Sequence, residues 1–340
     1  AFMVGTGFTP TVGSGPITDK SGNGNYLVTE GDYGTSPASA TLVSRCMDLT
    51  GMTSPVLQFR HHMYGADIGA IRVQWIKDGE NDWTNFMNPF TTTLTDEKDT
   101  WSFYEVDLSS QADKIVKLRF IAQKAGFGIG ADIAFDDIAI FDKTNVDVGI
   151  DHIIAPGARV NLAGGPAGKK VEVKIRNFGK NSQSNIPVYY TVTPTCGPNA
   201  GVSTTYTYTH STAVGAGAMG NAVDNTNTVT WPTGSFEIYA WTGMSGDTHG
   251  WNDSSFTRSA GWPELFIQSG FAEDFESCAA GDTSGFFAAG DLNLWKPGVI
   301  TALGGNKGYG TKVNGNVPGG VQEFLYFPRF IGFDTIAGAE

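Results

Sequence analysis

The chain has 340 residues and a formal net charge of −12, with 40% apolar, 16% charged and 12% aromatic residues. The acidic balance repels nucleic-acid phosphates and anionic membranes, so it argues against both as partners and suits a secreted, soluble protein. The low charged fraction excludes an acidic disordered chain, which would combine high charge with few apolar residues. With 45 glycines and little helical periodicity, the composition predicts an all-β protein with Gly-rich turns.

The cysteines and hydrophobic segments exclude several further classes of protein. Cys46, Cys196 and Cys278 are far apart and none belongs to a CxxC pair, so neither a zinc site nor a dense disulfide framework is expected. No stretch approaches the roughly 18 apolar residues of a membrane helix. The sequence has no signal peptide and begins with Ala1, so we expect a mature, processed or excised chain.

The first part of the chain reads as a series of strands. Apolar and polar residues alternate within PVLQFRHHMYG, where Leu57, Phe59, His61 and Met63 share one face. Gly, Asp, Asn and Ser turns separate the segments, as in a β-sandwich. The remaining strand candidates are AIRVQWIKDG, WSFYEVDLS, KIVKLRFIAQ and ADIAFDDIAIFD. We predict a sandwich over residues 1–145.

A second β-domain is predicted over residues 146–265. In KKVEVKIRNFG, Val171, Val173 and Ile175 alternate with charged residues, and SNIPVYYTVTP follows as another strand. The polar, Gly-rich and Thr-rich stretch over 197–230 has the composition of long hairpins or surface loops, before GSFEIYAWTG restores a strand.

Residues 266–340 are too few to bury a sandwich core of their own. When Tyr26 is set against Tyr309, a spacing of 283 positions, GNGNYLVTEGDYG lies on GNKGYGTKVNGN and ATLVSRCMDL lies on EFLYFPRFIG. We therefore expect residues 266–340 to repeat the beginning of the first domain, with the chain a window on a longer array. In that interpretation the first domain lacks its first strand, which would precede residue 1.

Residues 15–142 resemble the MAM family of extracellular jelly-roll sandwiches. The likeness rests on GPITDKSGNGNYLVTEG, on ATLVSRCMDLTGMTSPVLQFRHHMYG and on GIGADIAFDDIAIFD, in which Asp136-Asp137-Ile138 is the most specific element. The chain departs from animal MAM domains because their paired cysteines are absent. The resemblance implies that 1–145 is a MAM-like jelly roll and that 266–340 is the N-terminal part of a second one.

The middle domain resembles the immunoglobulin-like linking domains of large Bacteroidota surface proteins. The residues that carry this likeness are DVGIDHIIAPG, VEVKIRNFGKNSQSNIPVYYTV and YAWTGMSGD. The resemblance implies a repeat protein exported by the type nine (type IX) secretion pathway, with a role in adhesion or gliding motility. Secreted peptidases of the same group also carry such modules as appendages.

One segment, DKSGNGNYLVTE, matches the oxygen-ligand spacing of an EF-hand from Asp19 to Glu30. An EF-hand needs flanking helices, whereas NYLVTE alternates like a strand, so we reject that interpretation. By resemblance, jelly rolls of this kind hold a structural calcium ion near the first and last strands. The alternative is that Asp19 caps a turn and Asp137 binds backbone at a strand end. The candidate calcium ligands are Asp19, Asp136, Asp137, Asp274 and Glu276.

The other motifs give no support to a metal-binding, phosphate-binding or catalytic site. His61 and His62 are adjacent in a strand and point to opposite faces, so they cannot chelate one ion. AGGPAGKK lacks the spacing and the strand–loop–helix context of a phosphate loop, and no serine lies in GxSxG. Paired carboxylates for glycoside cleavage stay open, because their separation depends on the fold. Asp247 and Asp253 share a loop that is either a polar turn or another cation site.

These observations predict a non-enzymatic, extracellular or cell-surface segment of a repetitive adhesin or filament, with tandem β-sandwiches forming a stiff stalk. Its expected partners are itself or neighbouring domains of the same long chain, and surface glycans or proteins; nucleic acid and membrane insertion are not expected. The alternative is an accessory or carbohydrate-binding part of a secreted peptidase or glycan-degrading enzyme. Aromatic residues beside turns are candidates for sugar stacking: Trp83, Trp101, Trp231, Trp251 and Trp262.

Overall fold

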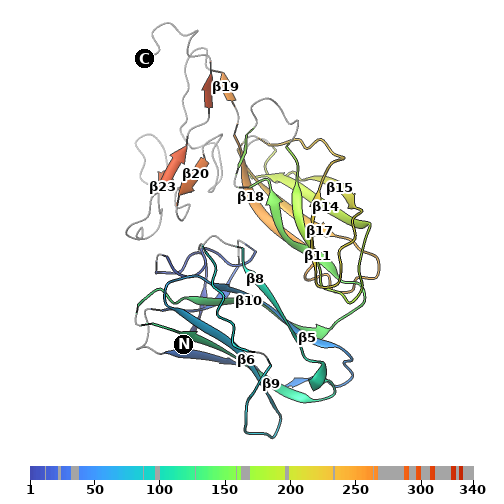
Figure 1. The fold of residues 1–340 in the computed structure, drawn as a ribbon. Helices are drawn as coiled ribbons and strands as arrows, with labels where there is room; N and C mark the ends of the chain where they lie inside the picture. The colour runs from blue at the N-terminus through green and yellow to red at the C-terminus, as the bar shows by residue number, and fades with distance from the viewer. Residues whose placement is uncertain are drawn as a thin grey trace. The chain divides into compact units, whose positions relative to one another are not determined.

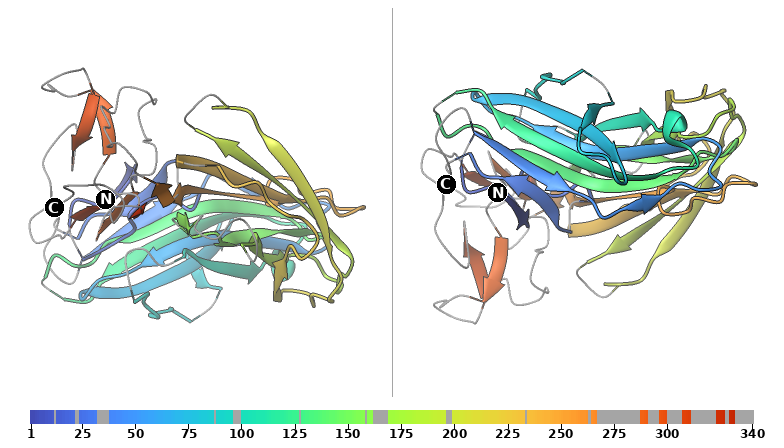
Figure 2. Two further views of the ribbon diagram at one scale, coloured as in Figure 1. Left: turned by 90° about the horizontal axis from the view of Figure 1, so that it is seen from above. Right: turned by 90° about the horizontal axis from the view of Figure 1, so that it is seen from below.

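The structure is a computed structural model of residues 1–340, and it divides the chain into unit 1, Ala1–Lys143, and unit 2, Thr144–Glu340. It describes residues 1–266, except 12, 22–23, 32–37, 87, 96–99, 127, 158, 162–168, 196–198, 233 and 263, and beyond them only five short strands. Figure 1 labels the main strands, and Figure 2 shows them from two further directions.

Unit 1 is a sandwich of two antiparallel sheets, as the alternating sequence predicts. Sheet A has the strand order β1-β2-β10-β5-β8, and sheet B has the order β3-β9-β6-β7, with β4 also paired to β9. A short 3-10 helix, Ser109–Gln111, precedes β9. The strands of sheet A are β1 (Phe2–Gly5), β2 (Tyr26–Thr29), β5 (Pro55–Met63), β8 (Ser102–Asp107) and β10 (Ile133–Asp142); those of sheet B are β3 (Ser39–Val43), β4 (Met47–Asp48), β6 (Ile68–Lys77), β7 (Thr84–Asn85) and β9 (Ile115–Lys124).

The core of unit 1 lies between the two sheets. Phe59 of β5 is fully buried and packs edge-on against Phe120 of β9, with ring centroids 5.2 Å apart, and Phe135 of β10 lies 6.0 Å from the same ring. Apolar residues at alternate positions supply this face, because successive side chains of a strand point to opposite sides. The predicted alternation of Leu57, Phe59, His61 and Met63 is confirmed, and all four are buried.

Sheet A is also covered on its outer face. A smaller cluster of Tyr26, Val28, Trp101 and Ala134 is buried there, and His62 packs against Trp101 with ring centroids 5.6 Å apart. The segment between β1 and β2 closes over this cluster through two hydrogen bonds: the Tyr26 hydroxyl donates to Gly7 O at 2.7 Å, and Trp101 Nε1 donates to Thr18 O at 3.1 Å. β5 is therefore buried along both faces.

The Asp136-Asp137-Ile138 element is a β-bulge. β10 pairs with β5 at Asp136 opposite Arg60 and at Ala139 opposite Gln58, so one extra residue is inserted in β10. Asp137 adopts φ 48°, in the left-handed region, and its side chain is exposed. Asp and Asn tolerate this conformation better than branched residues because their short side chains bond locally.

Substitutions at Asp137 will separate backbone strain from side-chain chemistry. Asp137→Val should lower the free energy of unfolding of unit 1 by about 1–2 kcal/mol, because a β-branched residue is strained at positive φ. Asp137→Gly and Asp137→Asn should change it by less than about 0.5 kcal/mol. Urea unfolding followed by tryptophan fluorescence measures the difference. A valine variant as stable as the glycine variant would contradict the strained geometry.

Unit 2 contains a second sandwich of two sheets. Sheet C has the order β11-β13-β16, and sheet D has the order β12-β18-β17-β14-β15, in which only β12 is parallel to its neighbour. Sheet C consists of β11 (Val148–Ala155), β13 (Glu172–Asn177) and β16 (Met219–Val223); sheet D consists of β12 (Arg159–Asn161), β14 (Ile186–Pro194), β15 (Thr204–His210), β17 (Gly234–Thr242) and β18 (Ser254–Trp262).

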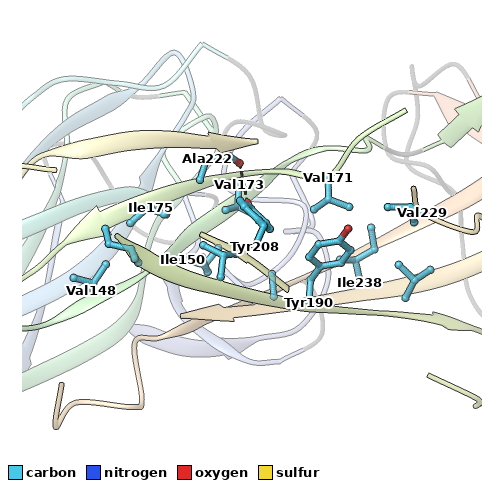
Figure 3. Close-up of a cluster of buried hydrophobic side chains, with 14 of the residues drawn as sticks. Val148, Ile150, Val171, Val173, Ile175, Tyr190, Tyr208, Ala222, Val229 and Ile238 are labelled. Atoms are coloured by element: carbon cyan, nitrogen blue, oxygen red, sulfur yellow. Dashed lines mark hydrogen bonds between the residues drawn. The ribbon is translucent and has the colours of Figure 1, made fainter. Parts of the chain in front are cut away.

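The inner faces of sheets C and D meet in an apolar core (Figure 3). Val171, Val173 and Ile175 are fully buried, which confirms their predicted alternation. Two tyrosines enter the same core. Tyr190 donates to Asp224 Oδ2 at 2.6 Å and Tyr208 donates to Ala222 O at 3.0 Å, so each buried hydroxyl has a partner.

Six further strands follow β18. They are β19 (Glu264–Phe266), β20 (Phe287–Gly290), β21 (Lys296–Val299), β22 (Lys307–Gly310), β23 (Glu323–Tyr326) and β24 (Arg329–Ile331), paired as β19-β24, β20-β23 and β21-β22. β22 contains Tyr309, and β23 falls on Ala40–Val43 of β3 at the spacing of the proposed repeat. The division at residue 265 and the second jelly roll stay predictions.

Candidate functional site

Asp19 and Asp136 lie beside each other at one end of the outer-face cluster. The backbone N–H of Lys20, the residue after Asp19, donates to Asp136 Oδ2 at 2.9 Å. The bulge in β10 turns Asp136 toward this loop, whereas the side chain of Asp137 is exposed. The structure therefore brings two of the predicted calcium ligands together and leaves the third outside.

Both oxygens of Asp19 already accept hydrogen bonds. Oδ1 accepts from Gly24 N at 2.7 Å and from the Thr18 hydroxyl at 3.1 Å, and Oδ2 accepts from Ser21 N at 2.9 Å and from the Ser21 hydroxyl. Burial by itself would raise the pKa of Asp19, but these donors outweigh it and hold the pKa below its usual value. This is the capped turn of the alternative interpretation, and calcium at Asp19 stays a prediction.

Asp136 has the opposite electrostatics. Burial, together with the charges of Asp137 and Asp19, raises the pKa of Asp136 to about 6, although two backbone hydrogen bonds act to lower it. A cation held between Asp19 and Asp136 would relieve that repulsion. Within the described residues, however, no three His, Cys, Asp or Glu side chains gather in a way that could hold a metal ion. Asp274 and Glu276 lie outside the described residues.

A second acidic pair, Glu30 and Asp132, lies at the other end of the cluster, and the sequence did not single it out. Glu30 is 6% exposed and Asp132 is fully buried. Glu30 Oε1 accepts from the Thr11 hydroxyl at 2.8 Å, and Asp132 Oδ1 accepts from Gly31 N at 2.7 Å. Burial, followed by the charge of Glu30, raises the pKa of Asp132 to about 7. Glu30 had entered the sequence argument only as the twelfth position of the rejected EF-hand pattern.

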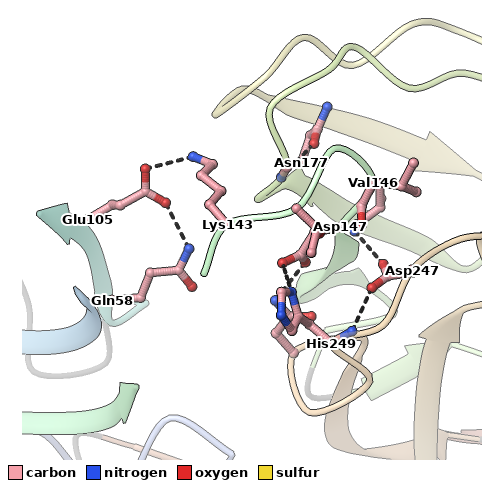
Figure 4. A network of polar contacts seen from close by, with 12 residues as sticks. Gln58, Glu105, Lys143, Val146, Asp147, Asn177, Asp247 and His249 are labelled. Carbon is pink, nitrogen blue, oxygen red and sulfur yellow. Dashed lines mark hydrogen bonds and ion pairs between the residues drawn. The ribbon is translucent and has the colours of Figure 1, made fainter. Parts of the chain in front are cut away.

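In unit 2, Asp147 and Asp247 both contact His249 (Figure 4). The charges of all three residues act on Asp253. Asp147 is fully buried, and its carboxylate contacts His249 Nδ1 and accepts from Asn252 Nδ2, both at 2.8 Å. Asp247 accepts from Val148 N at 2.7 Å and from His249 N at 3.0 Å. The loop that carries Asp247 is therefore joined to the beginning of β11, which agrees with a polar turn.

Asp253 should make unit 2 lose stability as the pH rises. Burial, then the charges of Asp247 and Asp147, raise the pKa of Asp253 to about 7. Below the unfolded-state pKa of about 3.9, the carboxyl is protonated in both states and does not destabilise the fold. As the pH rises from that value through the raised folded-state pKa, the folded state loses stability relative to the unfolded state. With solvent screening, Asp253→Asn should be more stable than the native chain by about 1–2 kcal/mol at pH 8 and equal to it near pH 4. Urea unfolding at both pH values tests this; an unchanged difference contradicts it.

Most of the predicted sugar-stacking tryptophans have other roles. Trp101 and Trp231 are buried, and Trp83 lies under the guanidinium of Arg119 at 4.3 Å. Trp251 is 51% exposed, and the side chain of Trp262 lies outside the described residues. A different aromatic group faces outward from sheet D: the ring of Trp241 stacks on Tyr189 at 5.6 Å and lies 5.5 Å from Tyr239.

Comparison with solved structures gives only weak similarity. A glycoside hydrolase domain of Endo-D from Streptococcus pneumoniae R6 is 15% identical, with a TM-score of 0.27, over 72% of this chain and 34% of that one. A calcium-binding mutant of Bacteroides uniformis beta-glucuronidase 2 is 7% identical, with a TM-score of 0.32, over 85% and 32%. These scores are too low to assign the neighbours' fold or activity to this chain.

Sequence comparison is more specific for unit 1. Thyroid hormone-induced protein B of Xenopus laevis is 32% identical over 133 residues, which are 39% of this chain and 18% of that protein. The chain therefore spans less than a fifth of this relative. Residues 5–145 match the family described as MAM domain, meprin/A5/mu. A MAM domain is thus detected at residues 5–145, on the sandwich of unit 1.

Proposed function

We propose that the chain is a non-enzymatic segment of an extracellular adhesion protein, in which folded β-sandwiches act as spacers and contact surfaces. The observation that supports this most is the MAM domain at residues 5–145, because MAM domains are extracellular, non-catalytic modules. A helix able to span a membrane is absent from the described part of the chain.

Edge strands offer a route to the predicted partners. β1 and β15 each lie at an edge of a sheet, where unpaired backbone groups can bind an added strand. β1 also exposes two apolar side chains, Met3 and Val4, which are 37% and 69% exposed. These features support self-association or contact with neighbouring domains of a longer chain. By resemblance, that chain would be a repetitive Bacteroidota surface protein of type IX export with a role in adhesion or gliding.

The test is an adhesion assay on the complete 340-residue chain. Beads coated with the chain should aggregate or bind a cell surface, and a Val4→Lys variant should bind less because it places a charge on the β1 edge. A matched Val202→Lys variant, which changes another exposed valine, should bind normally. The chain should also leave panels of glycoside and peptide substrates unchanged. Substrate turnover, or beads that never bind, would overturn the proposal.

A second function, carbohydrate binding, is supported by one observation. Tyr189, Trp241 and Tyr239 form a continuous aromatic surface on the outer face of sheet D, and Tyr239 is 45% exposed. Such rings can stack on the apolar faces of sugars. A glycan array should then show binding that Trp241→Ala abolishes and Trp251→Ala preserves. Equal loss in both variants, or no bound glycan, would exclude this surface.

A further inference from the structure

We infer that the outer face of sheet B binds an anionic polysaccharide through a row of three cations, Lys117, Arg119 and Arg72. The inference names a ligand class for the proposed adhesive function and rests on the extracellular setting that this function implies. It concerns a different surface from the β1 edge. Three observations carry it: the distribution of charge among the strands, the register of β6 with β9, and the contacts that fix Arg119.

Sheet B is basic in a chain that is strongly acidic. Its strands β3, β9, β6 and β7 contain no Asp or Glu residue, and β6 and β9 together contain five Lys and Arg residues. The net charge of the whole chain is −12. Acidic residues lie at the margin of the sheet, as Asp48 in β4 and Asp78 directly after β6. The face is therefore a place where an anion is attracted to an otherwise repelling molecule.

Three of these cations project from the outer face. Leu118 of β9 is buried in the core, so its neighbours Lys117 and Arg119 point away from the core. By the same alternation, Arg72 of β6 points outward beside the buried Val73. All three cations are half-buried. Their charged groups are thus held near the surface of the sheet and remain accessible to a ligand.

The register arranges the cations in a row. β6 pairs with β9 at Gln74 opposite Arg119 and at Arg72 opposite Ile121. Lys117 and Arg119 are two residues apart on one strand, which corresponds to about 7 Å. Arg72 is the diagonal neighbour of Arg119 across the strand pair, at about 7–8 Å. The row is therefore about 14 Å long, which suits an extended polymer with repeated charges.

The guanidinium of Arg119 is preorganised. It lies over the ring of Trp83, 4.3 Å from the ring centroid, and its Nε donates to Gln74 Oε1 at 2.6 Å. Gln74 is fixed in turn, because its Nε2 donates to Asn85 Oδ1 at 2.7 Å. These contacts use one face and one N–H of the guanidinium. Its terminal N–H groups can donate to a carboxylate or a sulfate with little further loss of side-chain entropy.

The neutral groups around the row favour a sugar polymer over an acidic peptide. Gln74 and Asn85 place amides beside the cations, and Thr41 of β3 adds an exposed hydroxyl opposite Ile121. Hydroxyls of a bound sugar lose water and need such donors and acceptors in return. A peptide added to a sheet gains specificity from pockets for its alternate side chains. This face offers amides and hydroxyls between cations, which matches the hydroxyls and anionic groups of an acidic polysaccharide.

Affinity measurements on the complete chain with soluble polymers test this surface. Polygalacturonate carries carboxylates and dextran sulfate carries sulfates, so the two arms identify the anion, and unmodified dextran is the neutral reference. We expect the chain to bind at least one anionic polymer and not dextran. Raising sodium chloride from about 50 mM to about 500 mM should weaken binding at least about tenfold, because salt screens exposed charges. Poly-glutamate, an acidic peptide, should bind at least about tenfold more weakly.

Matched variants locate the binding. Arg72→Gln/Arg119→Gln removes two of the three cations and should weaken binding at least about tenfold. Lys170→Gln/Lys174→Gln, beside and within β13 of unit 2, changes the net charge by the same amount and should bind like the native chain. Lys117→Gln, a single conservative change, should fold normally and still weaken binding about threefold. Thermal unfolding of each variant checks that unit 1 is folded.

Three results would overturn the inference. The native chain would bind neither anionic polysaccharide, both double variants would lose affinity equally, or poly-glutamate would bind as tightly as the polysaccharides and assign the face to an acidic protein. The bead assay separates these results from failure of the adhesive function. Beads should still aggregate with Arg72→Gln/Arg119→Gln and lose aggregation with Val4→Lys. Intact aggregation without polysaccharide binding would therefore overturn this inference alone.

Discussion

Replacing Asp224 with alanine should lower the free energy of unfolding of the unit 2 sandwich by about 3–5 kcal/mol, since hydrogen bonds to charged groups contribute about 1.5–3 kcal/mol each. Asp224 is 1% exposed, and its carboxylate accepts from the Tyr190 hydroxyl, from Thr226 N and from Asn227 N at 2.6 to 3.0 Å. Alanine would leave the fully buried Tyr190 hydroxyl without a partner. The measurement is urea unfolding of the complete chain, with hydrogen exchange of β14 amides to locate the loss.

Two milder variants apportion this effect. Asp224→Asn keeps an acceptor for Tyr190 but loses the charge, so it should cost about half as much as alanine. Tyr190→Phe keeps the ring in the core and removes one hydrogen bond, and should cost about 1–2 kcal/mol. If Asp224→Ala costs no more than Tyr190→Phe, the carboxylate does not hold the loop after β16 to the core, and the expected network is wrong.

Sequence periodicity predicted the strands because each strand has one face that must be apolar. β5, β6, β8, β9 and β10 all fall on segments expected to be strands, and so do β13 and β14. The stretch over 197–230 was less predictable. It contains β15, paired to β14 in sheet D, and β16, paired to β13 in sheet C. Both strands are polar, and their pairing partners depend on contacts with residues distant in the sequence. A local sequence pattern carries no information about such contacts.

The sequence identified candidate acidic residues, but it did not show which of them lie next to each other in the fold. Asp19 was expected to have Asp136 or Asp137 as a distant partner, with Asp137 preferred, whereas Lys20 N joins the Asp19 loop to Asp136. The bulge that selects Asp136 over Asp137 depends on the register between β5 and β10. Glu30 and Asp132 were missed for the same reason, because their opposition follows from the pairing of β2 with β10. A register prediction for these two strands would have found them.

The outer face of sheet A connects the fold with the proposed function. Tyr26 lies at its centre, and burial, then the charges of Asp132, Glu30 and Asp19, raise the pKa of its hydroxyl well above the usual value. The hydroxyl therefore stays a donor to Gly7 O and holds the covering segment down. This arrangement should help a spacer domain to stay folded, because β2 is paired with β10 and is also hydrogen-bonded to the segment between β1 and β2. Neutralising the pairs Asp19–Asp136 and Glu30–Asp132 would stabilise the contact between this segment and sheet A.

Acid should destabilise unit 1 through His61. The His61 ring is 6% exposed and packs against Phe90 at 4.8 Å and Phe59 at 5.9 Å. Burial, then the neighbouring Arg60 charge, lowers its pKa to about 4. A histidine with a lowered folded-state pKa contributes stability above its unfolded value of about 6.5, and that stability is lost as the pH falls toward 4. The difference between those pKa values corresponds to about 3 kcal/mol.

His61→Phe isolates this contribution, since phenylalanine keeps a ring against Phe90 and cannot titrate. Between pH 7 and pH 4, the native chain should lose about 3 kcal/mol more of unit 1 stability than this variant. Asp132 and Asp136 have raised pKa values that act in the opposite direction, but they are present in both proteins and cancel in the difference. His152→Gln, in unit 2, is the matched control and should leave unit 1 unchanged. If the free energy of unfolding of unit 1 changes with pH in the same way in the native chain and in His61→Phe, His61 is not held neutral. A buried ring that excludes the charged form must make the native chain more sensitive to acid.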